Sequence, residues 1–190
     1  MKHGCSHLCL LLASTWIASV AFGSDSWQEV LRIAWPPHWE YRPLQRQGPA
    51  IHLQAREQSG ELTLQRLDVT VVDARSAQKP ITSESIKDLA GKLRDASLST
   101  SIEKSIPLRE FSNHRGYYFV ASDAHFIGAK VNSFKQIIEG AMYESECLVN
   151  FTLLTNDASS VNAQQIVNAL SELQLTPLPD SVRPLPQGAR

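Results

Sequence analysis

Cysteine is nearly absent from this chain beyond its first 23 residues. Cys5 and Cys9 lie in that opening segment, so Cys147 is the single cysteine of the other 167 residues (190 minus 23). One cysteine excludes an intramolecular disulfide and the paired Cys-x-x-Cys spacing of redox and zinc sites. We therefore expect the chain to be held together by its hydrophobic core.

Several sequence motifs of enzymes and nucleotide-binding proteins are missing as well. The nine glycines are scattered, with no cluster that could cradle a phosphate. The sequence contains no Gly-x-Ser-x-Gly, P-loop, dinucleotide fingerprint or His-Glu-x-x-His. These absences predict a protein that is not an enzyme and that uses no cofactor or metal.

Neither sign of charge dominates. All 19 acidic residues and 17 of the 18 basic residues follow residue 23, for a net charge near −2. Nucleic acids and anionic membranes attract basic surfaces, and this composition supplies none. We expect no nucleic-acid partner.

The first 23 residues have the pattern of a secretory signal peptide. Lys2 gives a positive start, an apolar run extends from Leu8 to Phe22, and Ala21 and Gly23 are the small residues of a cleavage site. The run is shorter than the roughly 20 residues of a membrane span. Cleavage near Gly23 is expected to release a periplasmic or secreted protein. A disulfide-free exported domain is more typical of a bacterial periplasm.

The rest of the chain divides into one domain and a tail. Residues 24–175 are expected to form a single domain, because that length can bury a sizeable core and no second boundary is visible. Residues 176–190 contain four prolines and little to bury, which predicts a flexible tail.

Hydrophobic periodicity predicts an α+β fold. Alternating apolar residues predict strands at 30–35, 51–56, 62–71, 102–111, 117–121, 134–143 and 147–155. Apolar residues at helical spacing predict helices at about 83–98 and 160–173, and residues 38–49 are expected to be a loop. The order favours a mainly antiparallel sheet covered by helices.

Two local signals refine these elements. Thr82 suits the N-cap of the first helix, with Ile81 and Ile86 as a hydrophobic staple. Within 62–71 the apolar positions change from even to odd numbers, which predicts a bulge near Gln65 and Arg66.

The chain resembles the PsbP-type fold, named for the extrinsic PsbP protein of photosystem II, and the DcrB-like bacterial periplasmic proteins. The resemblance rests on the strand that runs into Trp-Pro-Pro-His-Trp at 35–39, the Thr-Ser-Glu helix start at 82–84, the Gly-Tyr-Tyr strand at 116–118 and the closing hairpin and helix. It covers most of residues 27–175. It implies an α/β/α sandwich that serves as a non-enzymatic accessory or binding module, and it transfers no catalytic residues.

The aromatic segment is the candidate binding site. Trp35, Trp39 and Tyr41 lie within seven residues of one another. Tryptophan and tyrosine are common anchors of binding surfaces. The same residues could instead plug the open end of the sandwich, which is favoured because tryptophan is highly buried on average.

A second constellation could carry acid–base or metal chemistry. Asp123 and His125 would share a strand face, and His114 lies across an expected turn. Glu144 and Glu146 flank a turn beside Cys147, which we expect to be a small strand residue rather than a nucleophile. A small hydrolase or metalloenzyme would require these side chains to meet in one pocket.

Three functions remain open. The first is a soluble exported accessory or binding protein with an unknown small-molecule or protein partner in the cell envelope. The second is an inhibitor or immunity-type protein with one dedicated partner. The third is the small hydrolase or metalloenzyme that uses His114, Asp123 and His125.

Overall fold

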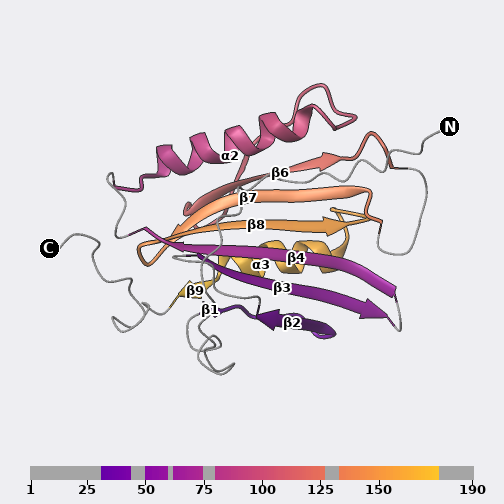
Figure 1. Ribbon diagram of the computed structural model, residues 1–190, viewed down its shortest axis with the longest axis horizontal. Coiled ribbons are helices and arrows are strands. Elements are labelled where there is room, and N and C mark those ends of the chain that lie inside the picture. Colours follow the sequence, from indigo (N-terminus) through magenta and orange to yellow (C-terminus); the bar gives the residue numbers. More distant parts are fainter. Residues whose placement is uncertain (1–30, 44–49, 60–61, 75–79, 127–132, 176–190) are drawn as a thin grey trace, which may run out of the picture.

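The computed structural model describes residues 31–43, 50–59, 62–74, 80–126 and 133–175. Within them lies a seven-stranded antiparallel sheet with the strand order β2-β3-β4-β8-β7-β6-β5 (Figure 1). Its strands are β2 (Trp39–Pro43), β3 (Ala50–Ser59), β4 (Leu62–Asp73), β5 (Arg109–Glu110), β6 (Gly116–Ser122), β7 (Gln136–Glu144) and β8 (Cys147–Thr155). A separate two-stranded sheet pairs β1 (Leu31–Arg32) with β9 (Gln174–Leu175).

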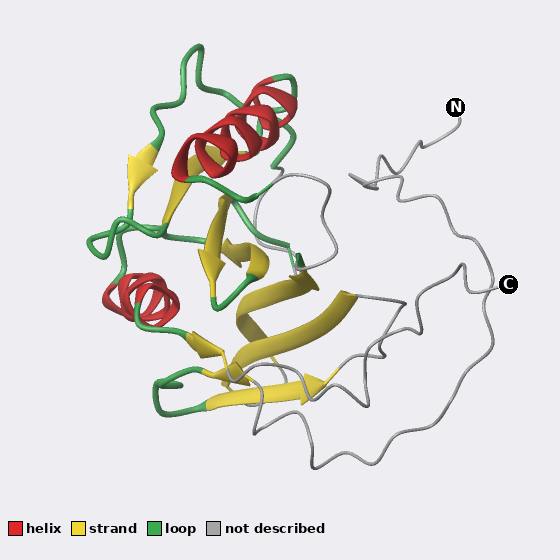
Figure 2. Ribbon diagram, turned by 90° about the vertical axis from the view of Figure 1, so that its left-hand side faces the viewer, coloured by secondary structure: helices red, strands yellow, loops and turns green. Residues whose placement is uncertain are grey.

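Two helices cover opposite faces of the large sheet (Figure 2). Helix α2 (Ser83–Leu98) packs on β6 and β7, and helix α3 (Val161–Ser171) lies on the other face. Successive residues of β6 face opposite sides of the sheet. Phe119 belongs to the small cluster beneath α2, whereas Val120 packs against the larger core beneath α3. The predicted α+β arrangement, an antiparallel sheet covered by helices, is confirmed.

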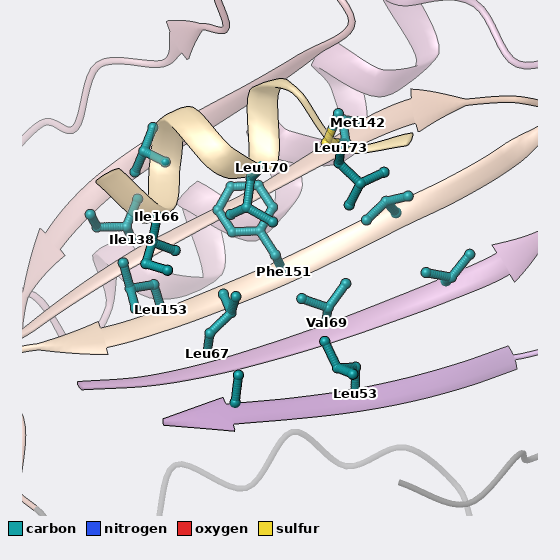
Figure 3. Packing of buried hydrophobic residues seen from close by; sticks show 14 of the residues in the cluster. Leu53, Leu67, Val69, Ile138, Met142, Phe151, Leu153, Ile166, Leu170 and Leu173 are labelled. Atoms are coloured by element: carbon teal, nitrogen blue, oxygen red, sulfur yellow. The ribbon is translucent and has the colours of Figure 1, made fainter. Parts of the chain in front are cut away.

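The main core forms where consecutive rows of apolar residues cross the sheet beneath α3. One row joins Leu53, Val69 and Phe151 on β3, β4 and β8. Helix α3 points Ile166 and Leu170 onto these rows (Figure 3). Full burial of each such side chain is worth about 1.5–3 kcal/mol, so this layer supplies most of the stability of the fold.

Both helices begin at the residues that the sequence indicates. Thr82 caps α2 by accepting a hydrogen bond from the Ser85 amide at 3.1 Å, and the Ser85 hydroxyl completes a capping box. Ser160 caps α3 in the same way through the Ala163 amide at 3.2 Å. Each cap satisfies amides that the first turn of a helix leaves without partners.

The hairpin of β7 and β8 turns through two residues at positive φ. Ser145 and Glu146 have φ angles of 48° and 63°, and Glu144 pairs with Cys147 across the turn. Two left-handed residues characterise the type I′ turn that matches strand twist. The turn sets the register in which Cys147 and Val149 face the core.

Three of the predicted elements differ from those observed. The strand expected at 30–35 is reduced to β1, because Pro36 and Pro37 follow closely and its partner is the unforeseen β9. The loop expected at 38–49 contains β2, whose Trp39 and Tyr41 face one side of the sheet. Of the strand expected at 102–111, only β5 forms a ladder.

The predicted bulge lies one residue earlier than expected. Gln58 pairs with Thr63 and Glu57 pairs with Gln65, which leaves Leu64 as the extra residue on β4. Leu64 is 41% exposed, as suits a residue outside the alternation. The expected signal peptide and proline-rich tail lie outside the described residues.

No helix among the described residues has the length and apolar character needed to cross a membrane.

Two glycines give a paired test of the packing. A Cβ at Gly140 would lie 2.4 Å from the Tyr117 carbonyl oxygen and 2.9 Å from Phe151 Cε1, whereas a Cβ at Gly91 in α2 would meet nothing within 4 Å. We expect Gly140→Ala to lower the free energy of unfolding by about 3 kcal/mol through overpacking. Gly91→Ala should raise it by about 0.5–1 kcal/mol through helix propensity. Urea unfolding midpoints measure both, and an unchanged midpoint for Gly140→Ala would contradict the packing described here.

Candidate functional site

The three candidate aromatic residues form one stack, which we call the aromatic edge: Trp35, Trp39 and Tyr41. The Trp35 ring stacks on Trp39 with centroids 6.2 Å apart and on Tyr41 with centroids 5.8 Å apart. Trp39 and Tyr41 are two residues apart on β2, the last strand on that side of the sheet. Trp35 therefore lies across two neighbouring rings.

A tight turn places Trp35 over the strand. His38 follows Pro37 and has a φ of 73°, in the left-handed region that non-glycine residues seldom adopt. Proline followed by a residue at positive φ is typical of a type II turn. The turn brings the chain back so that Trp35, which precedes it, meets Trp39 and Tyr41, which follow it.

The aromatic edge is partly buried and partly exposed to solvent. Trp39 is 9% exposed and belongs to the main core, whereas Tyr41 is 38% exposed. Trp35 is half-buried and packs against the same core. The expected burial holds for Trp39, and the outer two rings keep accessible area.

Next to Trp39, a row of polar residues crosses the sheet beneath the start of α3. We call it the polar row, and its members occupy successive strands in register: Glu57, Gln65, Thr155, Gln136 and Ser122. Trp39 pairs with Glu57 at one end of the row. Glu57, Gln65, Thr155 and Ser122 are each at most 6% exposed.

Hydrogen bonds connect part of the polar row to the start of α3. Gln136 Oε1 accepts from the Ala158 amide at 2.8 Å, and Gln136 Nε2 donates to Ser122 Oγ at 3.2 Å. Asn162 Nδ2 donates to Glu57 Oε1 at 2.5 Å. The row thus supplies partners to the polar groups at the beginning of the helix.

Two oxygens of the polar row are left without a donor among the described residues. They are Glu57 Oε2 and Gln65 Oε1, both inaccessible to solvent. Glu57 and Gln65 are directly opposite on neighbouring strands, so their Cβ atoms are about 5 Å apart. Buried acceptors are normally hydrogen-bonded, and each exception requires a physical explanation.

On the other face, Glu139 is a second buried carboxyl group. It is 8% exposed on β7 beneath α2, and its Oε2 accepts from Ser97 Oγ at 3.3 Å. Burial raises the pKa of Glu139, and hydrogen bonds from Ser97 and Thr152 oppose the rise without cancelling it.

The structure separates His114 from Asp123 and His125. His114 lies just before β6 and Asp123 just after it, and seven extended residues span roughly 20 Å. His114 Nδ1 lies 3.0 Å from Glu110 Oε1, and His125 Nδ1 lies 3.6 Å from Asp123 Oδ1. The described residues contain no group of three or more His, Cys, Asp and Glu side chains that could hold a metal. One pocket for His114, Asp123 and His125 is therefore not formed.

The residues around the β7–β8 turn have structural contacts. Glu144 forms an ion pair with Arg115, whose Nη2 also donates to the Ser171 carbonyl at the end of α3 at 3.0 Å. Cys147 is 5% exposed in the main core. The expectation of a small strand residue is confirmed for Cys147.

The polar row was not foreseen from the sequence. Its signal is present, however: the inward positions Ile51, Leu53 and Ala55 are followed in the same alternation by Glu57. The predicted strand ends at residue 56, one residue before this inward carboxylate, whereas β3 extends to Ser59.

Comparison with known proteins finds a likeness of fold. The solution structure of cyanobacterial PsbP (CyanoP) from Synechocystis sp. PCC 6803 matches over 87% of this chain and 99% of that chain, with a TM-score of 0.43 at 12% identity. By its name that protein is of the PsbP type that the sequence resembles. No family model matches the sequence, and no curated protein matches it either. At this TM-score and identity no argument about this chain rests on the match.

The buried Glu139 predicts a pH-dependent effect. Because its pKa is raised in the folded state, its contribution to stability is full below the unfolded pKa and is lost as pH rises through the folded pKa. An amide does not ionise, so Glu139→Gln should gain stability relative to the original chain as the pH rises above about 4.5, the ordinary pKa of a glutamate side chain. Urea unfolding of both chains between pH 4 and pH 8 measures the difference. A difference independent of pH would refute the assignment.

Proposed function

We propose that this chain is an exported, non-enzymatic binding or accessory protein that contacts a protein partner through the aromatic edge. The observation that carries the proposal is the stack of Trp35, Trp39 and Tyr41 on the last strand of the sheet, with Tyr41 38% exposed. Large aromatic side chains held rigidly at a surface are the usual anchors of protein interfaces.

The aromatic edge differs from the other exposed apolar residues of the described chain. Leu64, Ile102 and Val161 are exposed by 41%, 63% and 72%. These three side chains are aliphatic and cannot form a ring stack, and single exposed apolar residues are ordinary on protein surfaces. Trp35 is instead stacked on the core residue Trp39, and Tyr41 is stacked on Trp35, so a partner would order few additional side chains on binding.

Separation of His114 from Asp123 and His125 favours binding over catalysis. An enzyme built from these residues would need them within hydrogen-bonding reach of one substrate. The aromatic edge, by contrast, gathers its three rings into one stack.

The export step can be tested directly. In a bacterial host we expect the chain to be found outside the cytoplasm with Ser24 as its first residue, because Ala21 and Gly23 meet the small-residue requirement of signal peptidase. Ala21→Lys should block cleavage and leave the full-length chain associated with the cell. Ser26→Lys, beyond the cleavage point, is the control and should be processed normally. N-terminal sequencing of each fraction gives the answer, and a cytoplasmic full-length chain would rule out export.

The aromatic edge can be tested by photo-crosslinking in the cell envelope. A photoreactive phenylalanine derivative at the position of Tyr41 should capture a discrete partner, whereas the same derivative at the exposed Ile102 should not. Trp35→Ala should reduce the Tyr41 adduct at least tenfold, because it removes the ring that stacks on Tyr41. Circular dichroism verifies that each variant is folded. Equal adducts at both positions, or none at Tyr41, would reject the aromatic edge as the contact surface. A single adduct band would indicate a dedicated partner, as for an inhibitor or immunity-type protein.

A further inference from the structure

The polar row contains two buried oxygens that accept no hydrogen bond from the described residues. We propose that Glu57 and Gln65 bind the ammonium group of a protonated amine beside the Trp39 ring. The proposal stands on the two buried acceptors and not on the partner surface at Tyr41, so each can fail without the other.

The first argument is the cost of the unpaired acceptors. Glu57 is 6% exposed and Gln65 is 5% exposed, and Glu57 Oε2 and Gln65 Oε1 accept no hydrogen bond from the described residues. A buried polar group left without a partner costs about 1–3 kcal/mol, and more when it is charged. A ligand that donates hydrogen bonds to both oxygens removes that cost.

The second argument is charge. Among the described residues, no lysine or arginine forms an ion pair with Glu57, whose hydrogen-bond donor is the neutral Asn162 amide. A buried carboxylate is stabilised by a positive partner as well as by hydrogen bonds. The ligand best suited to the Glu57 carboxylate is therefore a cation that also donates hydrogen bonds.

The third argument is the neighbouring ring. Trp39 pairs with Glu57 across β2 and β3, so the indole and the carboxylate project from neighbouring strands on the same face of the sheet. A cation placed against an aromatic face gains about 0.5–2 kcal/mol, with tryptophan the most favourable ring. Carboxylate, amide oxygen and indole together are suited to an ammonium group, which carries three or four N–H donors.

The donor set fits an ammonium group better than a divalent metal. Ca²⁺ takes six to eight oxygen ligands. The two acceptors here come from one carboxylate and one amide, and Glu57 Oε1 is already engaged by Asn162. Ammonium needs only two or three acceptors and can share the remainder of its surface with a ring.

The test is thermal unfolding of the purified chain with ammonium chloride, against tetramethylammonium chloride, sodium chloride and potassium chloride at equal ionic strength. Ammonium should raise Tm by roughly 5 °C at a hundredfold excess over its Kd. Tetramethylammonium has no N–H donors and should not raise it. An equal rise in every salt, a larger rise in sodium or potassium, or no rise at all would overturn the proposal.

Matched variants locate the effect. Glu57→Gln should abolish the ammonium-dependent rise, because it removes the charge and supplies its own N–H donor to Gln65. Glu139→Gln changes the other buried glutamate on the opposite face and should retain the full rise. A rise that persists in Glu57→Gln, or is lost in Glu139→Gln, would contradict the assignment.

A second measurement does not depend on the folding of any variant. Proton NMR with ¹⁵N-ammonium should show bound ammonium protons that exchange slowly and lie close to the Trp39 ring. If the Gln65 amide instead donates to Glu57, or a water alone bridges the two oxygens, the same spectra will show no bound ammonium and the proposal is wrong.

One further arm identifies the source of the amine. A rise in Tm with ammonium and with n-butylammonium chloride would point to a lysine side chain of a partner. Butylammonium has the same four-carbon chain and terminal ammonium group as that side chain. A rise with ammonium alone would point to a small free amine. Both results support the ammonium site and differ only in what fills it.

Discussion

The fold depends on one contact layer, in which helix α3 covers the apolar face of strands β3, β4, β8 and β7. An eleven-residue helix is about 17 Å long, whereas the ten residues of β3 extend about 33 Å. Helix α3 therefore cannot cover that face from end to end. The apolar rows lie beneath the body of the helix, and the polar row lies where the helix begins. There, the Ala158 amide needs an acceptor and finds one in Gln136. The layout of apolar and polar rows follows from this difference in length.

The polar row also restricts how the strands can pair. A shift of one residue in β3 or β4 would turn Glu57 or Gln65 to the other face and bring a large apolar side chain out of the core. Buried polar groups that must meet specific partners penalise such alternatives more strongly than apolar groups do. The bulge at Leu64 lies directly beside Gln65 and takes up the extra residue between Thr63, which pairs with Gln58, and Gln65, which pairs with Glu57.

Local features could be predicted from the sequence, and features that join distant residues could not. Helix α2 and its Thr82 cap depend on neighbouring residues, and the prediction matches the observed bounds. The aromatic cluster was predictable because Trp35, Trp39 and Tyr41 are close in sequence, although its role stays a prediction. The sequence predicts a loop where strand β2 lies, because its proline-rich flanks resemble one and its ladder exists only through β3. The β1–β9 pair and the polar row depend on registers between strands far apart in sequence, which no local pattern reveals.

The small β1–β9 sheet has a consequence for how this domain can be connected to other chains. Leu31 pairs with Leu175, so the beginning of the first described strand lies beside the end of the last one. Domains whose ends meet tolerate circular permutation and insertion into a loop of another protein, because one surface point serves as both entry and exit. A host protein could accept residues 31–175 at a single exposed turn without separating its own flanking segments. Pulling the two ends apart would open two residue pairs first and leave the seven-stranded sheet unloaded until they had parted.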